Sequence, residues 1–598
     1  MKLGTQAERQ TALLAAAEAG DAALVQALVR AEPGLAAHKD AQGRTALLVA
    51  CKHGQLAAVR ALRELGAVSV HEQDGDELRG GRPVHYAAWG GSLAVIDYLL
   101  QHGASLRDTD LVGNTPLLYA VYGGHLGVVE ALLARGCSLL EKNQKGHSAI
   151  IQAACGGHQQ LVDWLLARGA SLAERDDVGN TALLFAAWGG HLDLLRHLLA
   201  RGASLHEVSD TGHTALLSAA NSGKLAVVQW LIKEQRVPLS QRNNNGDSAL
   251  LLAAFGGHCE LLRWLLENGA SINETNSDGL TALLSACNGG HQAMVEMLLK
   301  DGCSLNERNE SGYTPLILAA CGGHLDLVKW LVDRGCAIND RTADGDSALL
   351  LACYCGHGAI AEWILARGGS LRERNNTGLT PLISAANGGH GALCERLLEL
   401  GADIEQVDDD GYTALLLAAR RGYLSTIQTL MNYGANVDAQ TRNGASIYDL
   451  AQEHPAALAW LTQVRGYDRL QLAVGMRKPA MLERLLRDGH DPCVAPDYAQ
   501  RLYRLAANPT LDAPVCPKTL SLLQLARQPW SPANHHLHGP RYRSFVNILL
   551  LVKNRLGTDR PDLPFLPPEV WLHIASMAGR NIEKYTVRSS PAPSPMRI

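Results

Sequence analysis

The chain has 598 residues, with 54 lysines and arginines against 59 aspartates and glutamates, which gives a formal net charge of −5. This near balance argues against a globally basic nucleic-acid binder and against an acidic solvating tail. Hydrophobic residues make up 47% of the chain. That proportion supplies a large core and excludes wholesale disorder.

The sequence predicts a protein of a reducing compartment. No uninterrupted apolar run comes near the ~20 residues that a membrane span needs, and Glu8 and Arg9 precede any apolar run at the N-terminus, unlike a signal peptide. The 13 cysteines are odd in number and contain no Cys-x-x-Cys pair. We therefore expect reduced thiols, no structural zinc, and a cytoplasmic location, with the nucleus as the alternative.

A repeat dominates the chain from residue 8 to residue 465. Gly-x-Thr/Ser-Ala/Pro followed by an apolar residue recurs at intervals of 33 residues, with one interval of 34 before Ser248. Earlier copies lie at Thr11, Thr45 and Arg82, and a late copy lies at Ser446, which makes fourteen in all. In the regular part, the Thr or Ser position is occupied by Thr115, Ser148, Thr181, Thr214, Ser248, Thr281, Thr314, Ser347, Thr380 and Thr413.

Each copy predicts two short helices and a turn. Apolar residues follow the Thr at the spacing of one helical face, Gly-Gly or Gly-His ends that helix, and a second apolar helix such as residues 191–199 follows. The Thr hydroxyl can cap the first helix, and a glycine such as Gly202 can end the second. A unit this small cannot cover its own apolar face, so we expect neighbouring copies to stack into an α-solenoid.

The pattern resembles the ankyrin repeat. One copy shows the signature in Thr115-Pro116-Leu117-Leu118, Gly124-His125, Val129, Leu132-Leu133 and Gly136. The resemblance implies an all-α ankyrin-repeat solenoid of about 14 repeats of 33 residues, followed by a small helical C-terminal module. It also implies a protein that binds protein targets rather than nucleic acid or membranes.

Variable positions of the repeat are the candidate binding residues. One such position lies seven residues after the Thr, at the end of the first helix. The resemblance implies that this slot faces solvent and often contacts partners. Aromatic side chains are common interface hot spots. The alternative is that each ring packs between repeats. The aromatic members of this slot, which we call the groove row, are Trp89, Tyr122, Trp188, Phe255 and Tyr354.

The turn tips directly before the Thr form a second candidate contact line. Tyr313 and Tyr412, together with Leu280 and Leu379, are unusual choices for a solvated turn. We expect the two tyrosines to contact the same partner as the groove row.

Catalytic motifs and metal sites are not expected. The chain contains no Gly-x-Ser-x-Gly, His-Glu-x-x-His or P-loop motif, which predicts a protein that is not an enzyme and uses no cofactor. A histidine stands ten residues after the Thr in eight copies. The resemblance implies that it braces a turn by a hydrogen bond instead of ligating a metal. These eight are His125, His158, His191, His258, His291, His324, His357 and His390.

The last 130 residues depart from the repeat. We expect a degenerate repeat and helical cap over residues 466–527, a proline-marked linker over 528–539, a compact helical segment over 540–578 and a disordered tail over 579–598.

The segment 540–578 resembles a SOCS box through its helix followed by Leu-Pro-Phe-Leu-Pro, and an F-box through Leu-Pro-Pro-Glu-Val-Trp. Either resemblance implies docking of an elongin- or Skp1-type adaptor and a cullin, and hence a substrate receptor of a ubiquitin ligase. The alternative is a structural cap on a plain scaffold or sequestering inhibitor. The residues expected to dock the adaptor are Phe545, Leu549, Leu566 and Trp571.

Overall fold

A computed structural model describes residues 5–40, 42–65, 68–75, 80–466 and 471. The chain divides into two compact units, residues 1–343 and 344–598. The expected linker, the segment 540–578 and the tail lie outside the described residues, as does the expected cap over 466–527 apart from residues 466 and 471.

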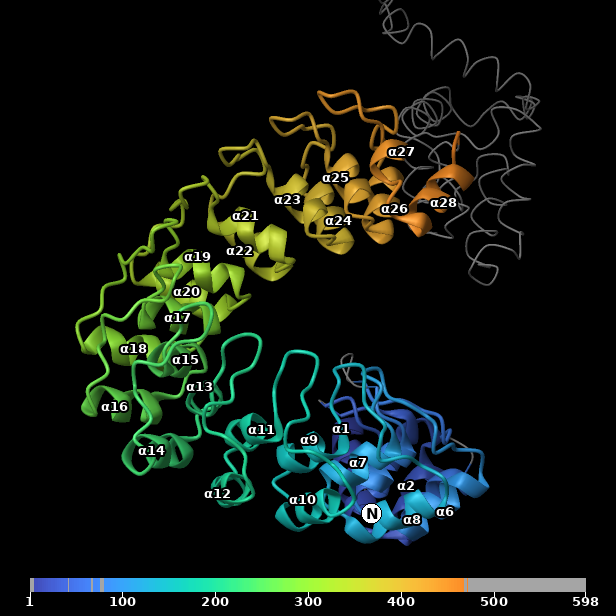
Figure 1. Ribbon diagram of the computed structural model, residues 1–598. Coiled ribbons are helices and arrows are strands. Elements are labelled where there is room, and N and C mark those ends of the chain that lie inside the picture. The colour runs from blue at the N-terminus through green and yellow to red at the C-terminus, as the bar shows by residue number, and fades with distance from the viewer. Residues whose placement is uncertain (1–4, 41, 66–67, 76–79, 467–470, 472–598) are drawn as a thin grey trace, which may run out of the picture. The chain divides into compact units, whose positions relative to one another are not determined.

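The described residues of the first unit form twenty α-helices in ten pairs and one short 3-10 helix. Figure 1 shows how the helices follow one another along the chain. They are α1 (Gln6–Ala19), α2 (Ala22–Ala31), the 3-10 helix Pro33–Ala37, α3 (Ala46–Lys52), α4 (Leu56–Glu64), α5 (Pro83–Trp89), α6 (Leu93–Gln101), α7 (Pro116–Tyr122), α8 (Leu126–Ala134), α9 (Ala149–Cys155), α10 (Gln159–Leu166), α11 (Ala182–Gly189), α12 (Leu192–Ala200), α13 (Ala215–Asn221), α14 (Leu225–Lys233), α15 (Ala249–Phe255), α16 (Cys259–Glu267), α17 (Ala282–Gly289), α18 (Gln292–Lys300), α19 (Pro315–Cys321) and α20 (Leu325–Asp333).

The second unit contributes eight described helices in four pairs, and α27 is reduced to a single turn. Its described part contains no strand, although isolated bridges occur, among them Val407 with Thr413 and Gln440 with Ser446. The helices are α21 (Ala348–Cys355), α22 (Gly358–Ala366), α23 (Pro381–Asn387), α24 (Gly391–Glu399), α25 (Ala414–Arg420), α26 (Leu424–Asn432), α27 (Ile447–Leu450) and α28 (Pro455–Gln463). The expected all-α solenoid of paired helices is confirmed.

Stacking of like helices builds the core. Within the first unit, each first helix packs on the first helix of the next pair, as α7 does on α9 and α9 on α11. The partner helices form a second layer behind them. In the pair α11–α12, Leu183 and Leu184 of the first helix and Leu194, Leu195 and Leu198 of the second are at most 2% exposed. The apolar side chains are thus buried between neighbours, as a repeat array requires.

Thr side chains fix where the first helices begin. The Thr115 hydroxyl accepts the main-chain N–H of Leu118 and donates to the Glu141 carboxylate at 2.6 Å. Capping of this kind satisfies a helix N–H that has no intrahelical partner. The same pair of bonds recurs at Thr181 with Glu207.

Two first helices differ from the expected pattern. The first copy does not begin after Thr11, which lies inside α1, because Thr5 and Glu8 form a capping box that starts the helix six residues earlier. Ser148 caps nothing, and its buried hydroxyl has no hydrogen-bond partner.

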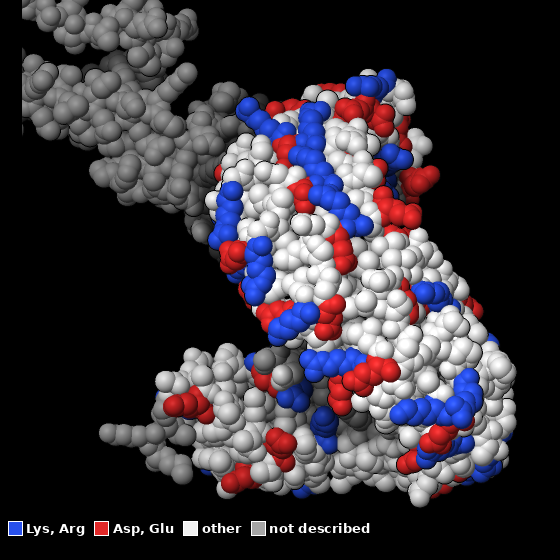
Figure 2. All heavy atoms as spheres, turned by 90° about the vertical axis from the view of Figure 1, so that its left-hand side faces the viewer, with Lys and Arg blue, Asp and Glu red and all other residues white. Residues whose placement is uncertain are grey.

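The loops between pairs project as turn tips that are hydrogen-bonded to one another. The main-chain N–H of Gln144 donates to the carbonyl of Val112 at 2.9 Å, and that of Asp177 donates to the carbonyl of Lys145 at 3.0 Å. Each tip is therefore held by the tip before it. Figure 2 shows that basic and acidic side chains are interspersed on the face it presents, among mostly uncharged residues.

Candidate protein-binding surface

The groove row lies at the C-terminal end of the first helices, where each main chain is held by the following repeat. The Nε2 of His125 donates to the carbonyl of Trp89 at 2.9 Å, and His158 does the same to Tyr122 at 2.9 Å. In the second unit His390 binds the carbonyl of Tyr354 at 2.9 Å. The histidines therefore brace the row across the repeat boundary.

Three members of the groove row are exposed to solvent. Trp188 is 48% exposed, and Phe255 and Tyr354 are each 45% exposed. These exposed fractions are large for aromatic side chains, because burying a whole ring stabilises a protein by several kcal/mol at ~25 cal/mol per Å² of apolar surface. The side chains therefore offer apolar area that a partner can cover.

Trp89 and Tyr122 are half-buried, unlike the other three members of the groove row. Their ring centroids lie 6.1 Å apart, and Tyr86 lies 6.0 Å from Trp89. The ammonium group of Lys52, which occupies the same slot two helices earlier, lies 3.8 Å from the Trp89 ring centroid. Adjacent aromatic residues in this slot cover one another, which is the packing alternative for these positions.

The two tyrosines of the turn tips are also half-buried. Tyr412 lies under the Arg420 guanidinium, whose carbon is 5.3 Å from the ring centroid. Polar residues in the same tip slot bind the next tip instead, as Asp247 does when it accepts from Asn276 at 2.8 Å. Tyr313 and Tyr412 thus keep part of their surface exposed, and the Tyr412 ring packs against a charged side chain.

A hollow of about 300 Å³ joins the groove row to the turn tips in the first unit. It is bounded by α7, α9 and α11 and by the tips that precede them. Its apolar lining includes Tyr119, Tyr122, Phe185 and Trp188, and its polar lining includes Lys145 and Gln152.

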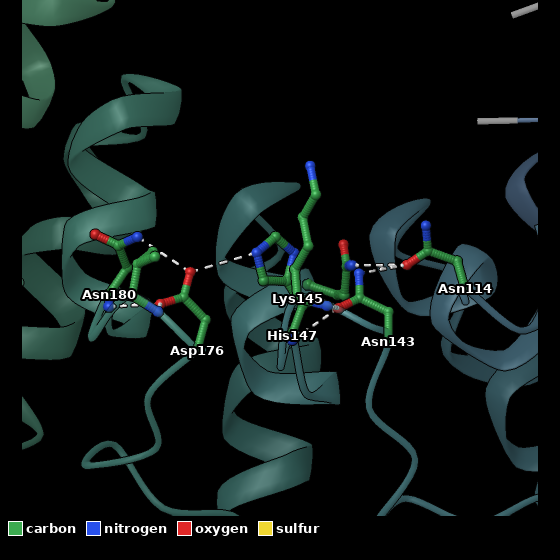
Figure 3. A network of polar contacts seen from close by, with 8 residues as sticks. Asn114, Asn143, Lys145, His147, Asp176 and Asn180 are labelled. Atoms are coloured by element: carbon green, nitrogen blue, oxygen red, sulfur yellow. Dashed lines mark hydrogen bonds and ion pairs between the residues drawn. The ribbon is translucent and has the colours of Figure 1, made fainter. Parts of the chain in front are cut away.

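A hydrogen-bonded network holds the tips at the edge of this hollow (Figure 3). The Asn143 amide donates to Asn114 Oδ1 at 2.9 Å, and its own oxygen accepts the main-chain N–H of His147 at 2.9 Å. The Asp176 carboxylate accepts from the Asn180 amide at 3.0 Å and lies 3.4 Å from His147 Nε2. These bonds fix the side chains around the hollow before any partner binds.

Burial sets the charge state of His147. Desolvation lowers the pKa of its imidazole, and the opposing attraction of Asp176 does not reverse that direction. The Phe185 ring packs edge-on against the imidazole with centroids 5.0 Å apart. The imidazole is therefore neutral at pH 7.

Sequence analysis missed the slot four residues after the Thr. This slot holds Tyr119, Gln152 and Phe185 in three consecutive repeats, and all three line the hollow. Later repeats of the first unit carry only Ser or Leu there. That change of residue type along the array is the signal that could have identified them.

The four predicted adaptor-docking residues, Phe545, Leu549, Leu566 and Trp571, lie outside the described residues. Within the described ranges, no group of three or more His, Cys, Asp or Glu side chains is placed to hold a metal ion. No helix in those ranges is long and apolar enough to cross a membrane.

Comparison with known proteins identifies the family. A search of the curated proteins gave no match. Among solved structures, the human ASB11 ankyrin repeat domain matches at 29% identity with a TM-score of 0.32, over 37% of this chain and 99% of that domain. The family model for ankyrin repeats (3 copies) matches nine overlapping segments that together span residues 2–495. The chain therefore belongs to the ankyrin repeat family, and its repeats form a protein–protein interaction scaffold.

Proposed function

We propose that the array binds a protein partner through the groove row and the adjacent turn tips. The observation that carries this proposal is the exposure of Trp188, Phe255 and Tyr354 in one repeat slot. Isolated exposed apolar residues are ordinary, but large aromatic side chains in a recurring slot are typical of interface hot spots. Their main chains are held in place, so little ordering remains to oppose binding.

Quantitative affinity capture tests the proposal. The wild-type chain and the double variant Trp188→Ala, Phe255→Ala are used as baits, and the recovered proteins are measured by mass spectrometry. We expect the double variant to lose specific partners by more than about tenfold, because each aromatic hot spot contributes about 2 kcal/mol or more.

Leu140→Ala is the matched control. Leu140 is 90% exposed but lies in the turn after α8, away from the groove row. Its substitution removes exposed apolar area without touching the proposed surface, so capture is expected to stay unchanged. Equal losses for the control and the double variant, or no loss for either, would contradict the proposal.

We further propose that residues 540–578 dock an elongin- or Skp1-type adaptor with a cullin, so that the array acts as a substrate receptor. This proposal rests on the sequence of that segment, in which Phe545, Leu549, Leu566 and Trp571 occupy the apolar positions of the two adaptor-box patterns. In the competing proposal the segment is a structural cap and the chain is a plain scaffold or sequestering inhibitor.

Truncation of the chain after residue 539 distinguishes the adaptor-box proposal from the structural-cap proposal. If the segment is an adaptor box, adaptor and cullin are recovered only with the full chain, while partners of the array are shared by both baits. If full chain and truncation recover the same proteins without cullin components, the receptor proposal is wrong and the segment is a cap.

A further inference from the structure

We propose that the hollow between α7, α9 and α11 binds an extended protein segment that presents a large apolar side chain next to an acidic residue. The inference rests on the proposed function, because it assumes that the groove row contacts a protein. It adds the place on the first unit and the chemistry of the bound segment.

The size and lining of the hollow favour a side chain over a folded domain. Its volume of about 300 Å³ lies at the lower end of the range for small-ligand pockets, ~300–1,000 Å³. Tyr122, Phe185 and Trp188 provide aromatic walls, and Leu118 contributes a buried aliphatic surface. Such a cavity accommodates one large apolar side chain and its adjoining main chain.

Gln152 supplies a fixed polar group at the same place. Its side chain is buried, with 8% exposure, and its amide nitrogen donates to Asn114 Oδ1 at 3.4 Å. No group in the described part of the chain donates a hydrogen bond to its Oε1, and this oxygen is not fully buried. The carbonyl is therefore open to a main-chain N–H of a bound segment.

Lys145 sets the charge preference. It is the one lining residue with a full charge at neutral pH, since the pKa of His147 is lowered and no Asp or Glu lines the hollow. Its ammonium group makes no hydrogen bond or ion pair with any described residue. Figure 3 shows its side chain pointing away from the Asn143–His147–Asp176 network. A carboxylate on the partner would satisfy it.

A basic residue in the turn tip beside aromatic residues of the groove row occurs once among the regular repeats of the first unit. The tip slot that holds Lys145 is otherwise occupied by uncharged or acidic residues: Val112, Val178, Thr211, Asn245, Asp278 and Ser311. Among the regular repeats of the first unit, a basic residue in this tip slot therefore lines a hollow with groove-row aromatic residues only here. That coincidence distinguishes it from the rest of the groove row.

Selection from a display library of random linear peptides on the full chain tests the inference. We expect enriched peptides to share a large apolar residue with an Asp or Glu close to it. For a synthetic enriched peptide, we expect Trp188→Ala to weaken binding by more than about tenfold. We expect Lys145→Glu to weaken it by up to about fivefold, the upper end of the range for an exposed charge pair. A peptide with Lys in place of its acidic residue should recover binding to Lys145→Glu.

Two matched variants make the result specific. Lys142→Glu changes the same charge three residues away at an exposed position outside the hollow, and Leu140→Ala removes an exposed apolar side chain from the turn after α8, also outside the hollow. Neither should affect the peptide. Equal effects of Lys142→Glu and Lys145→Glu, enrichment of peptides without an acidic residue, or no peptide sensitive to Trp188→Ala would overturn the inference. Partner capture that depends on Phe255 would still support the proposed function in each case.

Discussion

The Nε2 of His158 donates a hydrogen bond of 2.9 Å to the main-chain carbonyl of Tyr122, which ends the first helix of the preceding repeat. A carbonyl at a helix C-terminus lacks an intrahelical partner, and the imidazole supplies one. The bond also crosses the boundary between two repeats. It therefore links the stability of the stack to the position of the groove row.

Removing this imidazole tests its contribution. We expect His158→Ala to lower the free energy of unfolding by about 1 kcal/mol, the usual net value of one hydrogen bond. Urea unfolding followed by circular dichroism measures the total change, and amide hydrogen exchange around Tyr122 reports the local one. His38→Ala, which removes an exposed imidazole outside the repeat pattern, should change neither. Unaltered amide exchange near Tyr122 in the His158→Ala variant would show that the hydrogen bond does not stabilise this helix end.

Close approach of this imidazole requires glycine at position 124. Gly124 has φ of +79°, and a Cβ there would lie 2.4 Å from His158 Nδ1. Gly136 has φ of +92° with no atom near its would-be Cβ. We expect Gly136→Ala to cost about 1–2 kcal/mol from the left-handed backbone alone, and Gly124→Ala about 2–5 kcal/mol, because the contact adds to it. Thermal unfolding of the two variants measures the difference, and equal losses would exclude a role for the contact.

The helix caps differ in a way that can be measured. Thr181 caps α11 and donates to Glu207, whereas the Ser148 hydroxyl is buried without a partner. We expect Thr181→Ala to lower the free energy of unfolding by about 1–2 kcal/mol and Ser148→Ala to leave it nearly unchanged or slightly raised. Urea midpoints of the two variants give the comparison. A loss at Ser148 as large as that at Thr181 would mean that Ser148 has a partner in solution.

Acidification should destabilise the array through one buried and three partly buried histidines. Burial lowers the pKa of His147, and also that of His85, His213 and His291, below the unfolded value of ~6.5. The unfolded chain therefore binds protons first, so this stability is fully present above pH ~6.5 and is lost as the pH falls from there through the lower pKa of the folded state.

His147→Asn tests one of these groups. Asn occupies the same slot in the flanking repeats, at Asn114 and Asn180, and does not titrate. We expect the unfolding midpoint of the variant to fall less between pH 7 and pH 5 than that of the wild type. An identical pH dependence would show that His147 titrates alike in the folded and unfolded chains.

The fold could be predicted from the sequence because the same helix-start and helix-end signals occur in every regular copy of the repeat. Thr115 and its equivalents mark the helix starts, and glycines such as Gly202 mark the ends, so an error in one copy is corrected by the others. The prediction failed at Thr11, where the capping box of Thr5 and Glu8 overrides the periodic pattern. A local capping signal decided that position instead of the repeat.

The candidate surface was less predictable than the fold. The pattern placed Trp188, Phe255 and Tyr354 in one slot, and all three are exposed. It could not show that Trp89 and Tyr122 would cover each other, because ring contacts depend on the side chain in the neighbouring repeat. Gln152 was missed for a similar reason, since its exposure to the hollow depends on residues 33 positions away on either side.

The hydrogen bonds from histidine to the groove row end on carbonyl oxygens, which every amino acid has. His125, His191 and His324 make the same bond although the residues they hold are Trp89, Cys155 and Asn288. The brace and the proposed binding surface thus use different atoms of one position. A substitution in the groove row changes the side chain offered to a partner and leaves the brace intact, so the proposed surface is free to diversify from copy to copy without a matching change in the scaffold.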